Sequence, residues 1–226
     1  TENPLIVLAG PITGTTFPGS SRFAVCARSP QTGIWGEGTC GGNFGPMLKS
    51  CGIDGLYITG KAAAPAYLCV EDAKVTVHEA ADLWGKDTYE TGDILEKRHD
   101  EKRARVICIG PAGERLVKYA NINNDHGDVV GRCGMGAVMG SKNLKAVVVR
   151  GTQKVPVADQ AAYDAIRKDM FTKIKNSVPA DSLHSMGTDA SMDLGMMTGD
   201  IPIKNWSVGE DFELSAALGG PTMTEK

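Results

Sequence analysis

Two glycine-rich runs, each with an arginine nearby, are the residues in this sequence best suited to binding an anionic ligand. Arg22 precedes a run at residues 36–45, and Arg132 lies inside a second run at residues 127–140. A guanidinium can bind phosphate through two hydrogen bonds, and neighbouring backbone N–H groups can surround an anion. Glycine lacks a Cβ atom, so the backbone of such a run can approach a ligand closely. The alternative is that each arginine is a solvated or salt-bridged surface residue.

The second run departs from the known nucleotide-binding motifs. Residues 134–140 follow the pattern G-x-G-x-x-x-G, which is one residue longer than the Rossmann fingerprint, and a polar segment at 125–128 precedes them where that motif needs a buried strand. Gly140-Ser141-Lys142 resembles the end of a P-loop, but the complete P-loop pattern does not occur. A mononucleotide or dinucleotide site is therefore disfavoured.

The cysteines and histidines lack the spacings that local metal sites use. The six cysteines form no C-x-x-C pair and the four histidines form no H-E-x-x-H motif, which argues against a local zinc or iron–sulfur site. We expect most of the thiols to be reduced and buried. Cys40 and Cys133 are conceivable nucleophiles, but no histidine–acid pair can be assigned to either. Asp125 and Asp128 flank His126 and are better suited to ordering a loop than to acid–base chemistry. No catalytic residue is assigned.

The composition is that of an ordinary globular protein. Of the 226 residues, 42% are hydrophobic and 23% are charged, which allows a sizeable core. The net charge of −3 and the lack of a basic stripe predict no nucleic-acid partner. The apolar runs are far shorter than the roughly 20 residues of a membrane helix, and no signal peptide is visible. We therefore expect a cytoplasmic protein without membrane contact. The missing initial Met favours a fragment.

Apolar runs separated by glycine and proline predict a mixed α+β chain. The expected strands are residues 5–9, 23–27, 55–60, 105–109, 117–121 and 145–150, with a hairpin at 66–78; the expected helices are 44–51, 88–100 and 159–175, and the expected glycine-rich loops are 36–45 and 125–136. Asp159 is the expected N-cap of the last helix.

Two parts of the sequence follow the same pattern. Residues 6–11 (IVLAGP) parallel residues 106–111 (VICIGP), and each segment precedes a glycine-rich run that contains a Cys-Gly step, at Cys40 and at Cys133. Each run is followed by an apolar strand that ends in glycine. The pattern predicts duplicated β-sheet units with short helices. Two equivalent loops would suit a ligand that carries anionic groups on two arms.

The repeated pattern predicts how the chain divides into domains. We expect an N-terminal domain over residues 1–155, made of two related halves at about 1–62 and 104–152. Residues 156–226 are expected to form a helix and the start of a following, truncated domain.

At the glycine-rich loops the sequence resembles the aldehyde ferredoxin oxidoreductase family, whose members carry a tungsten or molybdenum bis-pterin cofactor. The matching segments are 10–15 (GPITGT), 22–23 (RF), 29–33 (SPQTG), 41–45 (GGNFG), 48–49 (LK), 109–114 (IGPAGE), 131–132 (GR), 136–146 (GAVMGSKNLKA), 187–188 (GT) and 204–205 (KN). The eleven-residue segment is highly specific, and the resemblance covers essentially the whole chain.

The resemblance implies a base domain of two related β-sheet units with the bis-pterin lying across it. A magnesium ion that bridges the two pterin phosphates would be held by the backbone carbonyls of Thr39 and Val129. The cofactor-binding residues that the resemblance implies are Arg22, Thr39, Gly41, Gly42, Asp128, Val129, Gly131 and Arg132.

Two of these residues depart from the family pattern. Thr39 stands where the family often has asparagine, a change that leaves a backbone ligand unaffected. Asp128 stands where the best-known members have a basic residue, and an aspartate repels phosphate unless a cation lies between them. Arg132 could compensate for the missing positive charge.

The implied activity is oxidation of an aldehyde to a carboxylate, with water as the oxygen source and ferredoxin as the electron acceptor. The ligands of a [4Fe–4S] cluster and the catalytic acid–base groups would lie outside this chain. One alternative is a family relative that reduces an aromatic acyl-CoA or a carboxylate. Another is a non-catalytic anion- or nucleotide-binding domain. The sequence does not choose between tungsten and molybdenum, and it leaves a homo-oligomer open.

Overall fold

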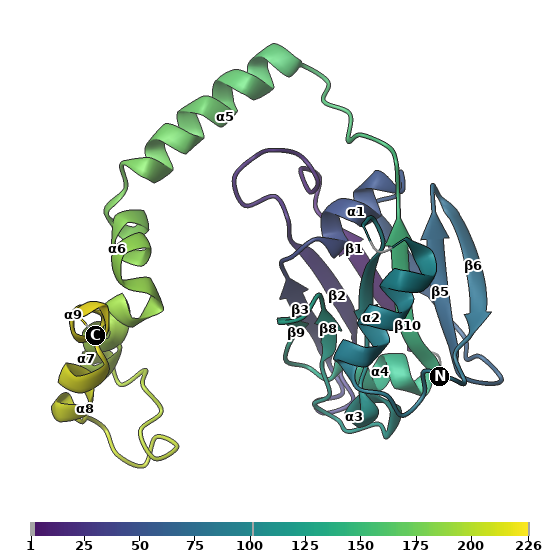
Figure 1. Cartoon of the computed structure of the whole chain (residues 1–226). Coiled ribbons are helices and arrows are strands. Elements are labelled where there is room, and N and C mark those ends of the chain that lie inside the picture. The colour runs from purple at the N-terminus through teal and green to yellow at the C-terminus, as the bar shows by residue number, and fades with distance from the viewer. Residues whose placement is uncertain (1–2, 101, 226) are drawn as a thin grey trace. The chain divides into compact units, whose positions relative to one another are not determined.

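The chain divides into two compact units, residues 1–158 and 159–226 (Figure 1). A computed structural model describes residues 3–100 and 102–225. The first unit contains two β-sheets and short helices, and the second unit is helical. The predicted α+β class is confirmed. The predicted domain boundary near residue 155 stays a prediction, although the two compact units divide close to it.

The bounds of the elements are as follows. The strands are β1 (Leu5–Ala9), β2 (Phe23–Arg28), β3 (Trp35–Cys40), β4 (Gly55–Ile58), β5 (Ala66–Glu71), β6 (Lys74–Glu79), β7 (Arg105–Cys108), β8 (Ile122–Asn124), β9 (Asp128–Val130) and β10 (Leu144–Arg150). The helices of the first unit are α1 (Phe44–Ser50), α2 (Thr88–His99), α3 (Pro111–Glu114) and α4 (Met135–Ser141). The second unit contains α5 (Gln160–Lys175), α6 (Val178–Met186), η1 (Gly187–Ser191), α7 (Met192–Thr198), α8 (Phe212–Leu218) and α9 (Gly220–Glu225).

The two sheets share one strand order. The first sheet is β3-β2-β1-β4, and all its neighbouring strands are antiparallel. In the second sheet, β9-β8-β7-β10 repeats this order, again with antiparallel neighbours. The β5–β6 hairpin extends the second sheet beside β10, with β5 parallel to β10. In both sheets a helix, α1 or α4, joins the third strand to the fourth. The shared order supports the predicted relation between the halves.

One hydrophobic core is built from residues of both sheets and of α1 and α4, and a second core lies under α2. Val147 and Val149 of β10 belong to the first core, whereas Ala146 and Val148 belong to the second together with Leu95 of α2. Because β10 is buried on both faces, its residues 146–149 are all apolar and do not alternate with polar ones. Figure 1 shows α2 lying across the outer face of the second sheet.

Both long helices begin at an aspartate. The side chain of Asp87 accepts a hydrogen bond from the backbone N–H of Glu90 at 2.8 Å, and α2 follows. Asp159 accepts one from the N–H of Ala162 at 2.9 Å, which confirms the predicted N-cap of α5. Such caps contribute about 1 kcal/mol each. The last turn of α2 is basic and ends at His99, which suits the negative end of the helix dipole.

Both predicted glycine-rich loops contain a strand. Within the predicted loop at 36–45, the segment Trp35–Cys40 forms β3 and pairs along its length with β2. Within the predicted loop at 125–136, Asp128–Val130 forms β9 beside β8. Glycine has a low intrinsic propensity for β-strands, but here pairing with a neighbouring strand outweighs that propensity.

The predicted strand at residues 117–121 is wrong. Leu116 has a φ of +59°, and the N–H of Ala120 donates to the carbonyl oxygen of Val117, so this segment turns. The strand of this region, β8, begins at Ile122. The apolar residues that suggested a strand here lie in or beside this turn.

The second glycine-rich run packs α4 against the protein's own backbone. A Cβ atom on Gly136 would lie 2.1 Å from the carbonyl oxygen of Asn121, and one on Gly140 would lie 2.0 Å from that of Gly113. No side chain fits at either position. The G-x-G-x-x-x-G pattern is therefore explained by helix packing and requires no nucleotide.

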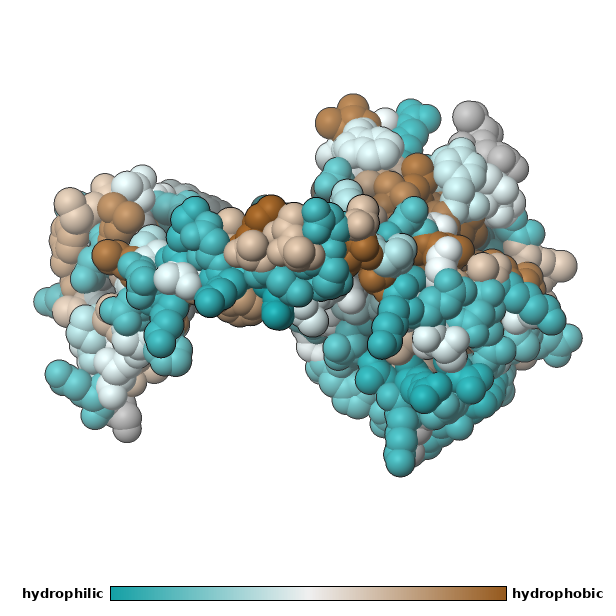
Figure 2. Space-filling model, turned by 90° about the horizontal axis from the view of Figure 1, so that it is seen from above, coloured by the Kyte–Doolittle hydropathy of each residue, from teal (hydrophilic) through white to brown (hydrophobic). Residues whose placement is uncertain are grey.

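The helices of the second unit are largely exposed. The α5 helix buries none of its residues and exposes Ile166, Phe171 and Ile174, and Figure 2 shows apolar residues among the charged ones along it. Across the described parts of the chain, no helix has both the length and the apolar character needed to span a bilayer.

Candidate cofactor-binding site

The two edge strands β3 and β9 lie next to each other. Gly38 of β3 faces Val130 of β9 so closely that a Cβ atom on Gly38 would be 2.6 Å from Val130 Cγ1. A side chain at position 38 would push the two strands apart. The missing side chain therefore lets the edges of the two sheets meet.

Each edge strand leads through a glycine turn into a helix. Gly41 and Gly42 connect β3 to α1, while residues 131–134 connect β9 to α4. Gly42 has a φ of +78° and Gly134 a φ of +77°, a region that side-chain-bearing residues rarely adopt. The two turns thus occupy equivalent positions in the two sheets.

Asn124 at the end of β8 links the first turn to the second sheet. Its side chain is fully buried, and its Nδ2 donates a hydrogen bond to the carbonyl oxygen of Gly41 at 2.8 Å. Its Oδ1 is also buried and has no hydrogen-bond partner among the described residues. A buried unpaired acceptor costs about 1–3 kcal/mol. Such an atom fits a donor or a cation that a bound ligand would supply.

Two carboxylates face the same turn. A Cβ atom on Gly42 would lie 2.7 Å from Asp125 Oδ2 and 2.8 Å from Asp128 Oδ2. Asp125 Oδ2 also accepts a hydrogen bond from the backbone N–H of Asn43 at 3.1 Å. This negative site suits a hard divalent cation such as magnesium, and a phosphate could lie beside it only with a cation between them.

The glycines of the site fall into two groups: some pack closely against the other half of the unit, and others have open space beside them. Gly38 and Gly42 are blocked by atoms of the other half. The Cβ position of Gly41 has no atom nearer than Ser21 Oγ at 4.0 Å, and that of Gly131 none nearer than Val129 Cγ2 at 3.8 Å. Gly41 and Gly131 therefore have open space beside their backbone.

Positive charge is supplied at both turns by exposed arginines. Arg22 Nη1 donates a hydrogen bond to Thr39 Oγ1 at 3.1 Å, which holds this guanidinium near the end of β3. Arg132 is exposed and directly follows Gly131. All of the sequence-predicted residues lie on the two edge strands, in their turns or beside them: Arg22, Thr39, Gly41, Gly42, Asp128, Val129, Gly131 and Arg132. Their role in cofactor binding stays a prediction.

Cys40 is suited to packing rather than to nucleophilic chemistry. Burial is the main cause that raises the pKa of its thiol, and a side-chain contact with Asn124 opposes the rise. A thiol with a raised pKa stays protonated at neutral pH and reacts slowly. The prediction that most thiols are buried is confirmed, since five of the six cysteines are buried and Cys133 is half-buried.

Sequence reasoning missed Asn124. It stands in the polar segment before Asp125, where an asparagine is usually taken as a turn former. The signal that could have found it is its position two residues after Ile122, because alternate residues of a strand point to the same face.

The comparison with known proteins identifies the family. Residues 1–151 match the domain described as "Aldehyde ferredoxin oxidoreductase, N-terminal domain". Because this match covers well over half of the chain, the protein belongs to the aldehyde ferredoxin oxidoreductase family.

Several curated relatives are similar along most of the chain. It is 39% identical over 209 residues to the tungsten-containing aldehyde ferredoxin oxidoreductase of Pyrococcus furiosus, covering 92% of this chain and 34% of the relative. It is 38% identical over 226 residues to the protein of that name from Thermococcus kodakarensis, covering 100% of this chain and 37% of the relative. An aliphatic sulfonate oxidoreductase, WOR-like subunit, from Pyrococcus furiosus is 32% identical over 222 residues, covering 91% of this chain and 34% of the relative. The chain spans about a third of the length of these relatives.

A solved structure supports the fold. The active site complex BamBC of benzoyl coenzyme A reductase, in complex with 1,5-dienoyl-CoA, matches with a TM-score of 0.74 and 40% sequence identity. The match covers 76% of this chain and 26% of that chain.

Proposed function

We propose that this chain supplies the cofactor-binding N-terminal part of a tungsten-containing oxidoreductase that oxidises aldehydes to carboxylates. The observation that carries the proposal is the meeting of the edge strands β3 and β9 at Gly38 and Val130, next to Thr39 and Val129. The names of the curated relatives support tungsten and the aldehyde reaction. Family membership supports a pterin-bound metal.

The residues at the two turns fit a bis-pterin. Arg22 and Arg132 are two separate exposed cations, one at each turn, and would bind the phosphates of the two pterins. The backbones of Gly41 and Gly131 have open space beside them, so each would contact one pterin arm. When bound, the metal and pterin supply the two-electron redox chemistry, and the protein holds and orients them.

A magnesium ion between the two phosphates would suit the negative charge of the carboxylates beside Gly42. Asp128 lies at the first turn together with Asp125, so a divalent cation there would remove the repulsion between carboxylate and phosphate. The backbone carbonyls of Thr39 and Val129 are the proposed ligands. Both residues lie on edge strands, where part of the backbone is not used by the strand's own sheet.

The electron acceptor of the whole protein is proposed to be ferredoxin, reached through a [4Fe–4S] cluster. The cluster ligands and the groups that contact the aldehyde belong to the part of the protein outside this chain. This chain contributes binding energy and orientation to the cofactor, and we assign no catalytic residue to it.

Full-length protein purified without oxygen tests the proposal. We expect stoichiometric tungsten, two pterins per chain and oxidation of an aldehyde coupled to ferredoxin reduction. Full-length protein that is folded, free of tungsten and molybdenum and inactive toward aldehydes would contradict the proposal and would favour a non-catalytic anion-binding domain.

A second candidate is reduction of an aromatic acyl-CoA. It is favoured by the 40% identity to the benzoyl coenzyme A reductase complex, which is close to the 39% identity to the tungsten-containing aldehyde ferredoxin oxidoreductase of Pyrococcus furiosus. The same metal-loaded protein should be assayed with an aldehyde plus an oxidised electron acceptor, and with an aromatic acyl-CoA plus a low-potential electron donor. Turnover of the thioester alone would select this second candidate.

A further inference from the structure

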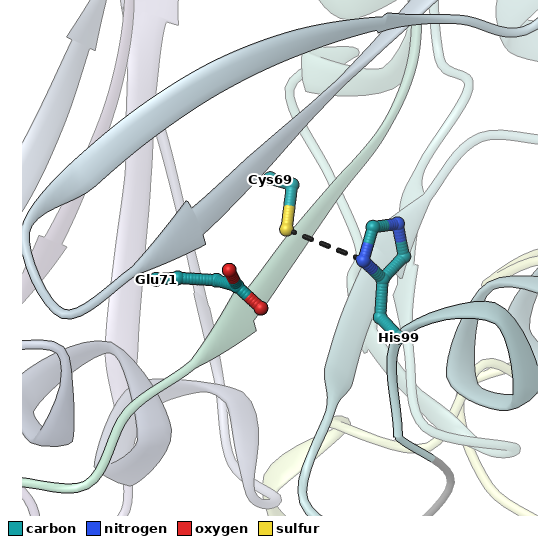
Figure 3. Close-up of side chains that lie close together, drawn as sticks. All are labelled: Cys69, Glu71 and His99. Carbon is teal, nitrogen blue, oxygen red and sulfur yellow. Dashed lines mark hydrogen bonds between the residues drawn. The ribbon is translucent and has the colours of Figure 1, made fainter.

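Three potential metal ligands converge on the face of the second sheet that α2 covers (Figure 3). Cys69 and Glu71 are two residues apart on β5, so their side chains point to the same face. His99 is the last residue of α2. One ligand atom from each residue lies within 4.8 Å of the others. None of the three belongs to the proposed pterin site.

The distance between sulfur and nitrogen matches a tetrahedral zinc site. Cys69 Sγ lies 3.5 Å from His99 Nδ1. With Zn–S of about 2.3 Å and Zn–N of about 2.0–2.1 Å, a tetrahedral angle places the two ligand atoms about 3.5 Å apart. The two atoms can therefore accept one zinc ion with little movement of either side chain.

His99 is held in the orientation that a metal ligand needs. Its other ring nitrogen, Nε2, lies 2.9 Å from the hydroxyl of Tyr67, whose side chain is buried. Ligating histidines usually bind a partner through the second ring nitrogen, which fixes the tautomer and the direction of the ring. Burial, followed by the nearby His78, lowers the pKa of His99, so its imidazole is neutral at neutral pH.

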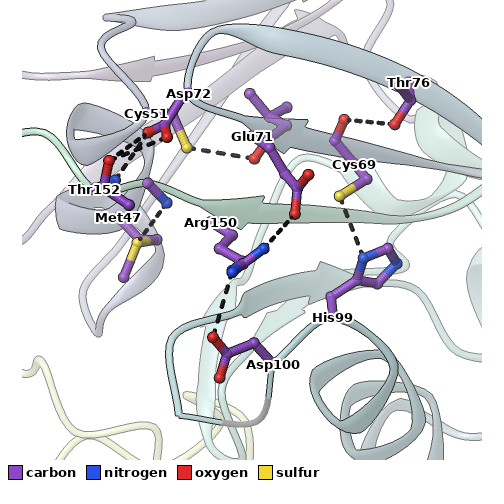
Figure 4. Close-up of polar contacts among 12 residues, drawn as sticks. Met47, Cys51, Cys69, Glu71, Asp72, Thr76, His99, Asp100, Arg150 and Thr152 are labelled. Carbon is purple, nitrogen blue, oxygen red and sulfur yellow. Dashed lines mark hydrogen bonds and ion pairs between the residues drawn. The ribbon is translucent and has the colours of Figure 1, made fainter.

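The surrounding charges favour a cation. Arg150 Nη1 donates to Glu71 Oε1 at 2.8 Å, and Arg150 Nε lies 3.5 Å from Asp100 Oδ2 (Figure 4). A second guanidinium, that of Arg98, also acts on His99, but it is paired with Asp82 at 2.7 Å. A carboxylate has two oxygens, so Glu71 can bind Arg150 through Oε1 and a metal ion through Oε2.

We propose that Cys69, Glu71 and His99 bind one zinc ion, with water as the fourth ligand. Thiolate, imidazole and carboxylate together suit zinc, whereas magnesium and calcium prefer oxygen ligands alone. The ion would fasten the end of α2 to β5. The cysteine thiol must lose its proton to bind the metal ion. Zinc binding should therefore release a proton.

Titration of the metal-free 226-residue chain with zinc chloride tests this proposal. We expect one zinc ion per chain and a higher melting temperature with zinc than without. Cys69→Ser and His99→Gln should each weaken zinc binding by at least about tenfold. The matched controls are Cys108→Ser, another buried thiol of the same core, and His126→Gln, an exposed histidine; both should bind zinc like the parent chain.

Cobalt(II) gives a second measurement that does not depend on the variants. The cobalt-loaded parent chain should show thiolate-to-cobalt charge-transfer absorption and the intense visible bands of tetrahedral cobalt. Tyr67→Phe should keep this absorption and weaken binding severalfold, because only the group that orients His99 is lost. A parent chain that binds no zinc, a cobalt spectrum without the thiolate absorption, or unchanged affinity in folded Cys69→Ser would each overturn the proposal. Circular dichroism of each metal-free variant establishes that it is folded.

Discussion

The side-chain amide of Asn124 donates a hydrogen bond to the backbone carbonyl of Gly41, 83 residues earlier in the chain, at 2.8 Å. The bond joins the second sheet to the turn that follows β3. It holds one wall of the proposed cofactor site against the other before any ligand arrives. A preorganised site loses less conformational freedom on binding and therefore binds more tightly.

Loss of this bond should destabilise the protein. We expect Asn124→Ala to lower the free energy of unfolding by about 1–3 kcal/mol, because the bond is buried and its partner would be left unpaired. Urea denaturation of the chain measures the change. Asn123→Ala, at the neighbouring half-buried position, is the control and should change stability by less than about 0.5 kcal/mol. Equal stability of the Asn124 variant and the parent would contradict the assigned contact.

The close approach of β3 and β9 should make position 38 intolerant of a side chain. Gly38→Ala should cost about 1–3 kcal/mol, because its Cβ atom would overlap Val130 Cγ1. Val130→Ala removes that methyl group, so Gly38→Ala should cost less in its presence. A double-mutant cycle measured by denaturation tests this coupling. Strict additivity of the two changes would show that the strands are not in contact at these residues.

The buried ion pair of Lys145 and Glu114 should be sensitive to loss of one partner. Lys145 Nζ lies 2.5 Å from Glu114 Oε1, and their side chains are 0% and 5% exposed. Lys145→Met should destabilise the chain by about 3–5 kcal/mol, because it leaves a buried carboxylate without its cation. The double variant Lys145→Met, Glu114→Gln should be more stable than Lys145→Met alone, as thermal unfolding would show. The opposite order would mean that the pair is not buried as described.

Glu96 should make the protein less stable as the pH rises. Burial is the main cause that raises the pKa of Glu96, and Arg105 opposes the rise. Between the usual glutamate pKa and the raised pKa of the folded state, the folded protein binds more protons than the unfolded protein. The free energy of unfolding therefore falls as the pH rises from the lower of these two pKa values to the higher. Glu96→Gln should raise the melting temperature more at pH 7 than at pH 4. A larger gain at pH 4 would reverse the sign and contradict the assigned cause.

Elements with a strong local pattern could be predicted from the sequence. The strand at Leu5–Ala9, the hairpin of β5 and β6 and the capped helix α2 were all expected near their observed bounds. Strands β3 and β9 could not be predicted, because glycine and aspartate give no local strand signal and their pairing depends on neighbouring strands.

Convergence of distant residues was harder to predict. The resemblance placed two glycine turns at one cofactor, and the structure brings together the edge strands β3 and β9 that lead into them. The resemblance gave no indication that Asn124 bonds to the turn after β3. The Cys69, Glu71 and His99 cluster was also missed, since its ligands come from β5 and α2 and lie up to 30 residues apart, without the spacing of a local metal motif.

The tungsten content of full-length protein variants tests the central claim most directly. Gly41→Val and Gly131→Val place a side chain in the space that the pterins would occupy, while Gly92→Val places one in open space on α2, outside the proposed pterin site. We predict that the first two lose most of the tungsten and pterin found in the parent, and that Gly92→Val retains both. If Gly41→Val and Gly131→Val are folded and carry the full complement of tungsten, the two turns do not hold the cofactor.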